Sequence, residues 1–157
     1  MNKKNIYLIL SIIWMGIIFY MSNQPGNISQ NLSQNVEHLL NSTPIVGDIF
    51  SNILNSAMSQ FILRKMAHFS LYAFLAVLCF ILIYEINRNI KKSTLISFII
   101  ISIYSCMDEI HQIFIPGRNA QLIDVFIDCI GGVVGLAIIN VFFILKSKFK
   151  KLSSENN

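Results

Sequence analysis

Ionisable side chains gather at the end of a long apolar segment. Residues 105–118 read Ser-Cys-Met-Asp-Glu-Ile-His-Gln-Ile-Phe-Ile-Pro-Gly-Arg, so Asp108, Glu109, His111 and Gln112 fall within about two helical turns. Carboxylates and imidazoles can act as general acids and bases, bind a metal ion or carry protons. Ionisable groups are costly at membrane depth and are normally kept because they have a function there.

Two more polar groups stand at the ends of apolar runs. Arg64, Lys65 and His68 precede the run 69–86, and acidic residues open the run 122–145. Successive membrane-spanning helices alternate in direction, so all three polar groups fall at the same end of the predicted bundle. We therefore expect them to form one constellation.

The elements that position these groups are membrane helices. Of the 157 residues, 54 % are hydrophobic and 13 % are charged, about half the charge of a soluble domain. The apolar runs predict spanning helices at about 6–21, 69–86, 95–115 and 122–145. The fold class expected is all-α: a single integral membrane domain, residues 1–157, with four transmembrane helices.

The segment between the first two runs divides into two parts. Residues 22–43 are polar and rich in Asn, Ser and Gln, with Pro25–Gly26 as a turn signal. From residue 44 to 63 apolar residues come in pairs every four positions, which predicts an amphipathic helix on the outer side. This helix would lie in the interface or pack across the mouth of the bundle, or form a lid over a site.

Basic residues predict the orientation of the bundle. They cluster beside apolar runs, which is typical of orientation signals and excludes a nucleic-acid surface. One set of helix ends carries Lys3, Lys4, Arg88, Lys91, Lys92, Lys146, Lys148, Lys150 and Lys151. The opposite set carries only Arg64, Lys65 and Arg118. The positive-inside rule places both termini in the cytoplasm and the polar constellation outside.

Helical periodicity predicts which faces meet. At 100° per residue, five polar residues share an arc of about 120°: Ser102, Ser105, Asp108, Glu109 and Gln112. Asp124 and Asp128 follow the same line as Gly131 and Gly135, and this GxxxG pattern lets a neighbouring helix approach closely. We therefore expect the polar side chains to point inward, toward one another.

Four kinds of site agree with these residues. A hydrolytic or transfer site would use Asp108 or Glu109 as base and His68 or His111 as acid, with nearby cations holding a phosphate or carboxylate. A divalent-metal site would take ligands from different helices, since Glu109-x-His111 is not an HExxH motif. A proton pathway is a third alternative. A buried ion-pair network that sets helix register is the fourth.

Three strings in the sequence resemble the signature of the VanZ-like family. They are R-K-x-A-H-F-x-x-Y at 64–72, D-E-x-H-Q-x-F-x-P-G-R at 108–118 and D-x-x-x-D-x-x-G-x-x-x-G at 124–135. The string at 20–26, Y-M-S-N-Q-P-G, is similar to the family's short motif at the end of its first helix. The resemblance implies a small multi-pass protein of the bacterial cell membrane, associated with low-level teicoplanin resistance in Gram-positive bacteria. It implies no particular reaction.

The leading hypothesis is an outward-facing polar pocket that binds or modifies an anionic envelope lipid or a lipid-linked cell-wall precursor. The alternative is a non-enzymatic membrane protein that alters antibiotic access, with the polar cluster as a structural ion-pair network. The candidate catalytic residues are Asp108, Glu109, His111 and His68. The candidate substrate-binding residues are Arg64, Lys65, Gln112, Arg118, Asp124 and Asp128. The leading hypothesis assigns no metal ligand, and it leaves both the cofactor and enzymatic activity open.

Overall fold

The protein is a bundle of membrane-length helices. The computed structural model describes residues 2–43 and 56–155, and all regular secondary structure in these ranges is helical. The helices are α1 (Lys3–Ser22), α2 (Gly26–Asn41), α4 (Ser56–Asn87), α5 (Ile90–Gln112) and α6 (Leu122–Glu155). Four of them, α1, α4, α5 and α6, are long and apolar enough to cross a membrane, which confirms the predicted all-α bundle. The predicted apolar runs fall within these helices, except that residues 113–115 lie past the end of α5.

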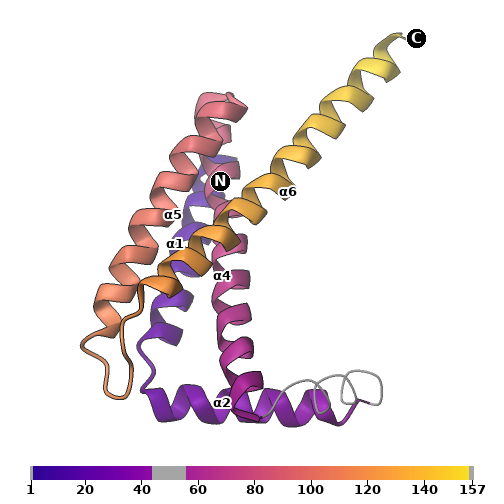
Figure 1. Ribbon diagram of the computed structural model, residues 1–157. Helices are drawn as coiled ribbons and strands as arrows, with labels where there is room; N and C mark the ends of the chain where they lie inside the picture. The colour runs from indigo at the N-terminus through magenta and orange to yellow at the C-terminus, as the bar shows by residue number, and fades with distance from the viewer. Residues whose placement is uncertain (1, 44–55, 156–157) are drawn as a thin grey trace.

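Helix α4 is the centre of the bundle. It contacts each of the other four described helices, and Tyr72, Leu75 and Phe80 on it are fully buried. Helix α1 is attached to it by the indole of Trp14, which donates a hydrogen bond of 2.9 Å to the carbonyl oxygen of Leu71. Helix α5 and the first half of α6 cover its other sides, whereas the second half of α6 diverges from the bundle (Figure 1).

Two glycines of α6 allow it to pack closely against α4, as the GxxxG pattern predicts. A methyl group added at Gly131 would overlap the carbonyl oxygen of Phe69, and one added at Gly135 would overlap that of Ala73. The obstacle is helical backbone in both cases, so it cannot rotate away. This packing brings the start of α6, which carries Asp124 and Asp128, against the start of α4.

Gly135→Ala is therefore expected to lower the free energy of unfolding by about 2 kcal/mol, since overpacking typically costs 1–3 kcal/mol. Gly16→Ala is the matched control, because nothing lies within 4 Å of the added methyl group. The control should be neutral or slightly stabilising, because alanine favours a helix by about 1 kcal/mol over glycine. Unfolding in mixed micelles, followed by circular dichroism, measures both. Equal stability of the two variants would contradict close α4–α6 packing.

Helix α2 is an element that the sequence analysis did not assign. It lies across the end of the bundle (Figure 1). Its sequence is mostly polar, but Ile28, Leu32 and Val36 recur every four residues and form one apolar stripe. Of the predicted amphipathic helix 44–63, residues 44–55 lie outside the described residues, and residues 56–63 form the first turns of α4.

Helix α2 is attached at both of its ends. At its start, the backbone N–H of Gly26 donates 3.1 Å to the carbonyl oxygen of Pro116. Gly117, at positive φ (74°), leaves no room for a side chain on Gly26. Toward its other end, Glu37 accepts hydrogen bonds from Ser59, and from Gln60 at 3.2 Å. These contacts hold α2 across the end of the bundle where α1 and α5 finish and α4 and α6 begin; we call this the α2 end.

Candidate functional site

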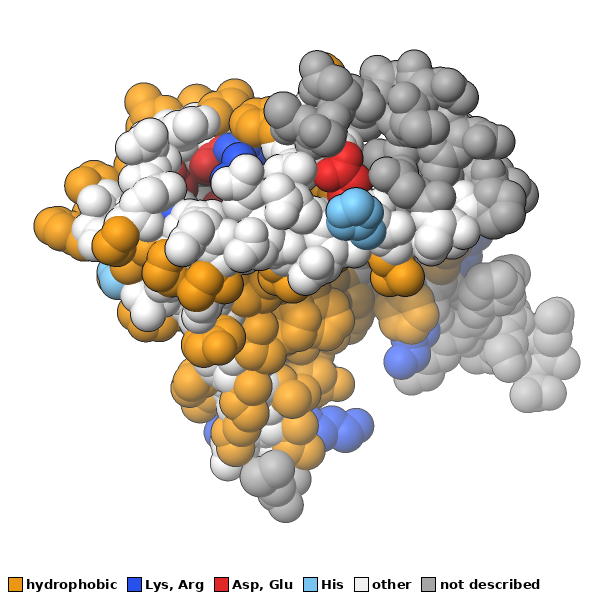
Figure 2. Space-filling model, turned by 90° about the horizontal axis from the view of Figure 1, so that it is seen from below, with side chains coloured by type: hydrophobic (Ala, Val, Ile, Leu, Met, Phe, Trp, Pro, Cys, Tyr) orange, Lys and Arg blue, Asp and Glu red, His pale blue; other side chains and the backbone are white. Residues whose placement is uncertain are grey.

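A cavity of about 560 Å³ lies at the α2 end, between α2 and the adjoining ends of the spanning helices. Its apolar wall includes Ile28, Leu32 and Val36 of α2, each at least 40 % exposed. Its polar wall includes, among others, Ser22, Arg64, Lys65, His68, Gln112, Arg118 and Asp124. Viewed from the α2 end, acidic and basic side chains lie in a hollow among polar groups, and hydrophobic side chains lie at the edge of the described part of this face (Figure 2). The cavity is therefore amphipathic.

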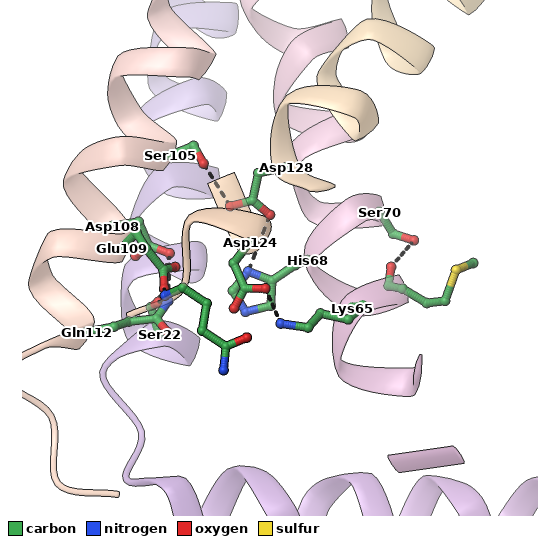
Figure 3. A network of polar contacts seen from close by, with 12 residues as sticks. Ser22, Lys65, His68, Ser70, Ser105, Asp108, Glu109, Gln112, Asp124 and Asp128 are labelled. Atoms are coloured by element: carbon green, nitrogen blue, oxygen red, sulfur yellow. Dashed lines mark hydrogen bonds and ion pairs between the residues drawn. The ribbon is translucent and has the colours of Figure 1, made fainter. Parts of the chain in front are cut away.

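Behind this wall three predicted residues converge from three helices. His68 of α4, Asp108 of α5 and Asp128 of α6 each offer a ligand atom within 4.8 Å of the others (Figure 3). Nδ1 of His68 lies 3.5 Å from Oδ1 of Asp128. Both carboxylates are buried, with 4 % and 1 % of their surfaces exposed. The cluster therefore brings an imidazole on the cavity wall together with two acids out of contact with water.

Neutral donors hold one oxygen of each carboxylate. The hydroxyl of Ser22 donates 2.8 Å to Oδ2 of Asp108, and the amide of Gln112 donates 3.2 Å to the same oxygen. The hydroxyl of Ser105 donates 2.9 Å to Oδ2 of Asp128. Ser22 and Ser105 were not among the predicted site residues. Ser22 belongs to the 20–26 string, and Ser105 lies one turn before Asp108 and Glu109, so both left a signal.

The cations of the cavity differ in their partners. Lys65 forms a close ion pair with Asp124, and only 17 % and 15 % of these side chains are exposed. Arg64 is exposed on the cavity wall and has no ion-pair or hydrogen-bond partner among the described side chains. Within ranges 2–43 and 56–155, Arg64 is therefore the cavity cation that an anionic ligand could contact without breaking an ion pair.

Arg118 supports the α2 end from within. Its guanidinium donates to the carbonyl oxygens of Gln24 (2.9 Å) and Met21 (3.1 Å) and to Oε1 of Gln112 (3.3 Å). Burial lowers the pKa of Arg118 and the negative charge of Asp108 opposes this shift, but a guanidinium stays protonated in proteins. Arg118 thus joins the end of α1 to the end of α5.

Two predicted catalytic residues lie apart from the cavity wall. Oε1 of Glu109 accepts a hydrogen bond of 2.5 Å from the backbone N–H of Gln121, so this carboxylate holds the loop before α6. His111 stacks on Phe19, with ring centroids 4.7 Å apart, and its Nε2 lies 3.2 Å from the amide oxygen of Asn23. His68, and not His111, is the histidine that the fold brings to the buried carboxylates.

Fold and site together define a multi-pass membrane protein with a polar cavity at one end of its helix bundle. A sequence model of the VanZ/LLP1 family matches residues 7–144, most of the chain, and the protein belongs to this family. The resemblance carried by the three motifs is thereby confirmed. No curated protein and no solved structure matches the chain.

Proposed function

We propose that the cavity at the α2 end binds an anionic amphiphile of the bacterial envelope, namely an anionic lipid or a lipid-linked cell-wall precursor. The observation that carries the proposal is the composition of the cavity wall. Arg64 offers a positive charge that no described side chain pairs, and the stripe Ile28, Leu32 and Val36 offers an apolar surface in the same cavity. A headgroup phosphate would contact the cation and an acyl chain would pack on α2.

The distribution of charge supports an outward-facing cavity. The helix ends opposite α2 carry most of the lysines and arginines, and the positive-inside rule assigns such ends to the cytoplasm. In this orientation the termini are cytoplasmic and the cavity opens at the outer leaflet of the cell membrane. The ligand would therefore be a lipid or precursor that reaches the outer leaflet.

The same cavity has groups that could modify a bound ligand. His68 lines it directly, and Asp108 and Asp128 lie behind His68. Proton transfer to or from a ligand would use these three residues. Glu109 is less suited to act as the base, because its oxygen is already engaged by the backbone of Gln121.

Binding is tested with short-chain phosphatidylglycerol added to the purified protein in a neutral detergent. The melting temperature should rise with phosphatidylglycerol and not with phosphatidylcholine, since a ligand of the folded state stabilises it. Arg64→Gln should weaken the apparent affinity roughly tenfold, as expected for one lost charge-assisted contact of about 1.4 kcal/mol. Arg88→Gln is the matched control, because Arg88 pairs with Glu85 at the opposite end. Unchanged affinity in Arg64→Gln would refute this placement of the ligand.

The biological setting is tested separately. We expect the unmutated protein to raise the teicoplanin tolerance of a sensitive Gram-positive host, and Arg64→Gln at matched membrane levels to give less protection. Equal protection by both proteins would favour a second function, a membrane protein that alters antibiotic access without binding in the cavity. The observation favouring that alternative is that Lys65, Asp124 and Arg118 are bound to other parts of the protein. Absence of protection by either protein would refute the link to teicoplanin.

A further inference from the structure

Three buried polar atoms of this cluster have no hydrogen-bond partner among the described residues. They are Nδ1 of His68, Oδ1 of Asp108 and Oδ1 of Asp128, and no described residue donates to or accepts from them. Unpaired polar atoms are strongly disfavoured in a low-dielectric interior. No lysine or arginine in the described ranges lies within ion-pair distance of either carboxylate. His68, whose Nδ1 lies 3.5 Å from Oδ1 of Asp128, is therefore the one basic side chain beside these acids among the described residues.

Hydrogen bonds hold both carboxylates of the cluster in place. Each carboxylate uses Oδ2 to accept hydrogen bonds, from Ser22 and Gln112 in one case and from Ser105 in the other. Figure 3 shows Ser22 and Gln112 on the side of Asp108 that faces α2, and Ser105 on the side of Asp128 that faces away from α2. Outer donors that orient ligands in this way are typical of metal sites.

A fourth buried group points to the same place. The hydroxyl of Tyr72 is fully buried and has no hydrogen-bond partner among the described residues. Tyr72 lies one turn beyond His68 on α4, and therefore on the same face. It is an unsatisfied polar group from outside the acidic pair.

We propose that His68, Asp108 and Asp128 bind one divalent transition-metal ion. One imidazole nitrogen and two carboxylate oxygens form a ligand set that suits Zn²⁺, and Mn²⁺ in second place. Two ligands at about 2.1 Å from a tetrahedral Zn²⁺ are about 3.4 Å apart, and the His68–Asp128 separation is 3.5 Å. The ligand atoms of all three residues lie within 4.8 Å of one another. A small rotation of the Asp108 side chain would therefore bring its carboxylate to the ion.

The ion would balance the buried charge and leave a coordination position open. Two carboxylates and one neutral imidazole cancel the charge of a divalent cation. Three protein ligands leave a fourth position for an oxygen from water or from a ligand, as in catalytic zinc sites. His68 lines the cavity, so this position would face the ligand site. The metal site is independent of the proposed lipid ligand, because all its ligand atoms come from the protein. Metal binding can therefore be measured without added lipid.

The test is the metal content of the full chain, purified in mild detergent without chelators and dialysed against micromolar Zn²⁺ and Mn²⁺. We expect close to one divalent ion per chain by elemental mass spectrometry. His68→Ala and Asp128→Asn should each reduce the content at least tenfold. The matched controls His111→Ala and Asp124→Asn change the same residue types outside the three-residue set, and should retain the ion. If Asp124→Asn retains the ion, the metal site is distinct from the carboxylate on the cavity wall.

A second readout guards against loss of folding in a variant. Chelation by EDTA should lower the melting temperature of the unmutated protein, and adding Zn²⁺ back should restore it. The same treatment should leave the melting temperature of Asp128→Asn unchanged. The proposal is overturned if the unmutated protein retains no divalent ion, or if the variants and their controls lose it to the same degree. Metal binding without lipid binding would support this site and refute the proposed function alone.

Discussion

Lys65→Leu or Asp124→Leu alone is expected to lower the free energy of unfolding by about 3 kcal/mol, whereas the double variant should recover most of that loss. The pair connects the start of α4 to the start of α6, with only 17 % and 15 % of its side chains exposed. Removing one partner of a buried pair costs about 3–5 kcal/mol because a buried charge is stranded. Replacing both with apolar residues is often neutral. Partial exposure places this pair at the lower end of the range.

The measurement is a double-mutant cycle by reversible unfolding in mixed micelles. The Arg88–Glu85 pair is the comparison, because 63 % of the Arg88 side chain is exposed, and exposed pairs contribute about 0–1 kcal/mol. Additive losses in the Lys65–Asp124 cycle would show that the two charges act independently. A stable double variant that no longer binds phosphatidylglycerol would mean that the pair also serves the ligand.

Much of the fold follows from the length and spacing of apolar residues. Each span is a run near the length that a bilayer requires, and polar clusters mark its ends. The helices extend further than the runs: α4 begins at Ser56 and α6 continues to Glu155. No proline or glycine interrupts the chain at either place, so the helix continues through polar sequence.

Helix α2 is harder to predict because its composition hides its pattern. Asparagine and serine fill more than half of residues 27–35 and disfavour helix in water. The stripe Ile28, Leu32 and Val36 has only three members, which is a weak helical signal. Its role is evident only in the structure, where all three residues line the cavity. Attachment through Gly26 and Glu37 depends on segments distant in sequence. Helix propensity alone therefore does not predict where α2 is attached.

The candidate site, like the fold, could be predicted from the sequence only in part. Helical spacing correctly indicated that Asp108 and Gln112 share a face, and Gln112 indeed donates to Asp108. It did not distinguish His68 from His111, because both histidines lie at the same end of the bundle. The choice depends on how each helix is rotated about its axis, which packing decides. Gly131 and Gly135 bring α6 onto α4, and this contact places Asp128 beside His68.

Arg118→Lys is expected to release α2 although it keeps the charge. The guanidinium donates in three directions, to Met21, Gln24 and Gln112. A lysine ammonium is a compact point charge and cannot span these acceptors. Hydrogen bonds to charged groups are worth about 1.5–3 kcal/mol each, so the loss of one or two should destabilise the α2 end by about 3 kcal/mol.

Hydrogen exchange measured by mass spectrometry localises this effect. Amides of residues 26–41 should exchange faster in Arg118→Lys, while amides in the middle of α4 should keep their protection. Arg64→Lys is the control, because Arg64 has no partner among the described side chains, and it should leave exchange in α2 unchanged. Unaltered exchange in α2 of a folded Arg118→Lys protein would show that α2 is held without Arg118. Faster exchange together with weaker phosphatidylglycerol binding would show that α2 must stay in place for the cavity to bind its ligand. Arg118 would then act on binding by positioning α2, and Arg64 by contacting the ligand.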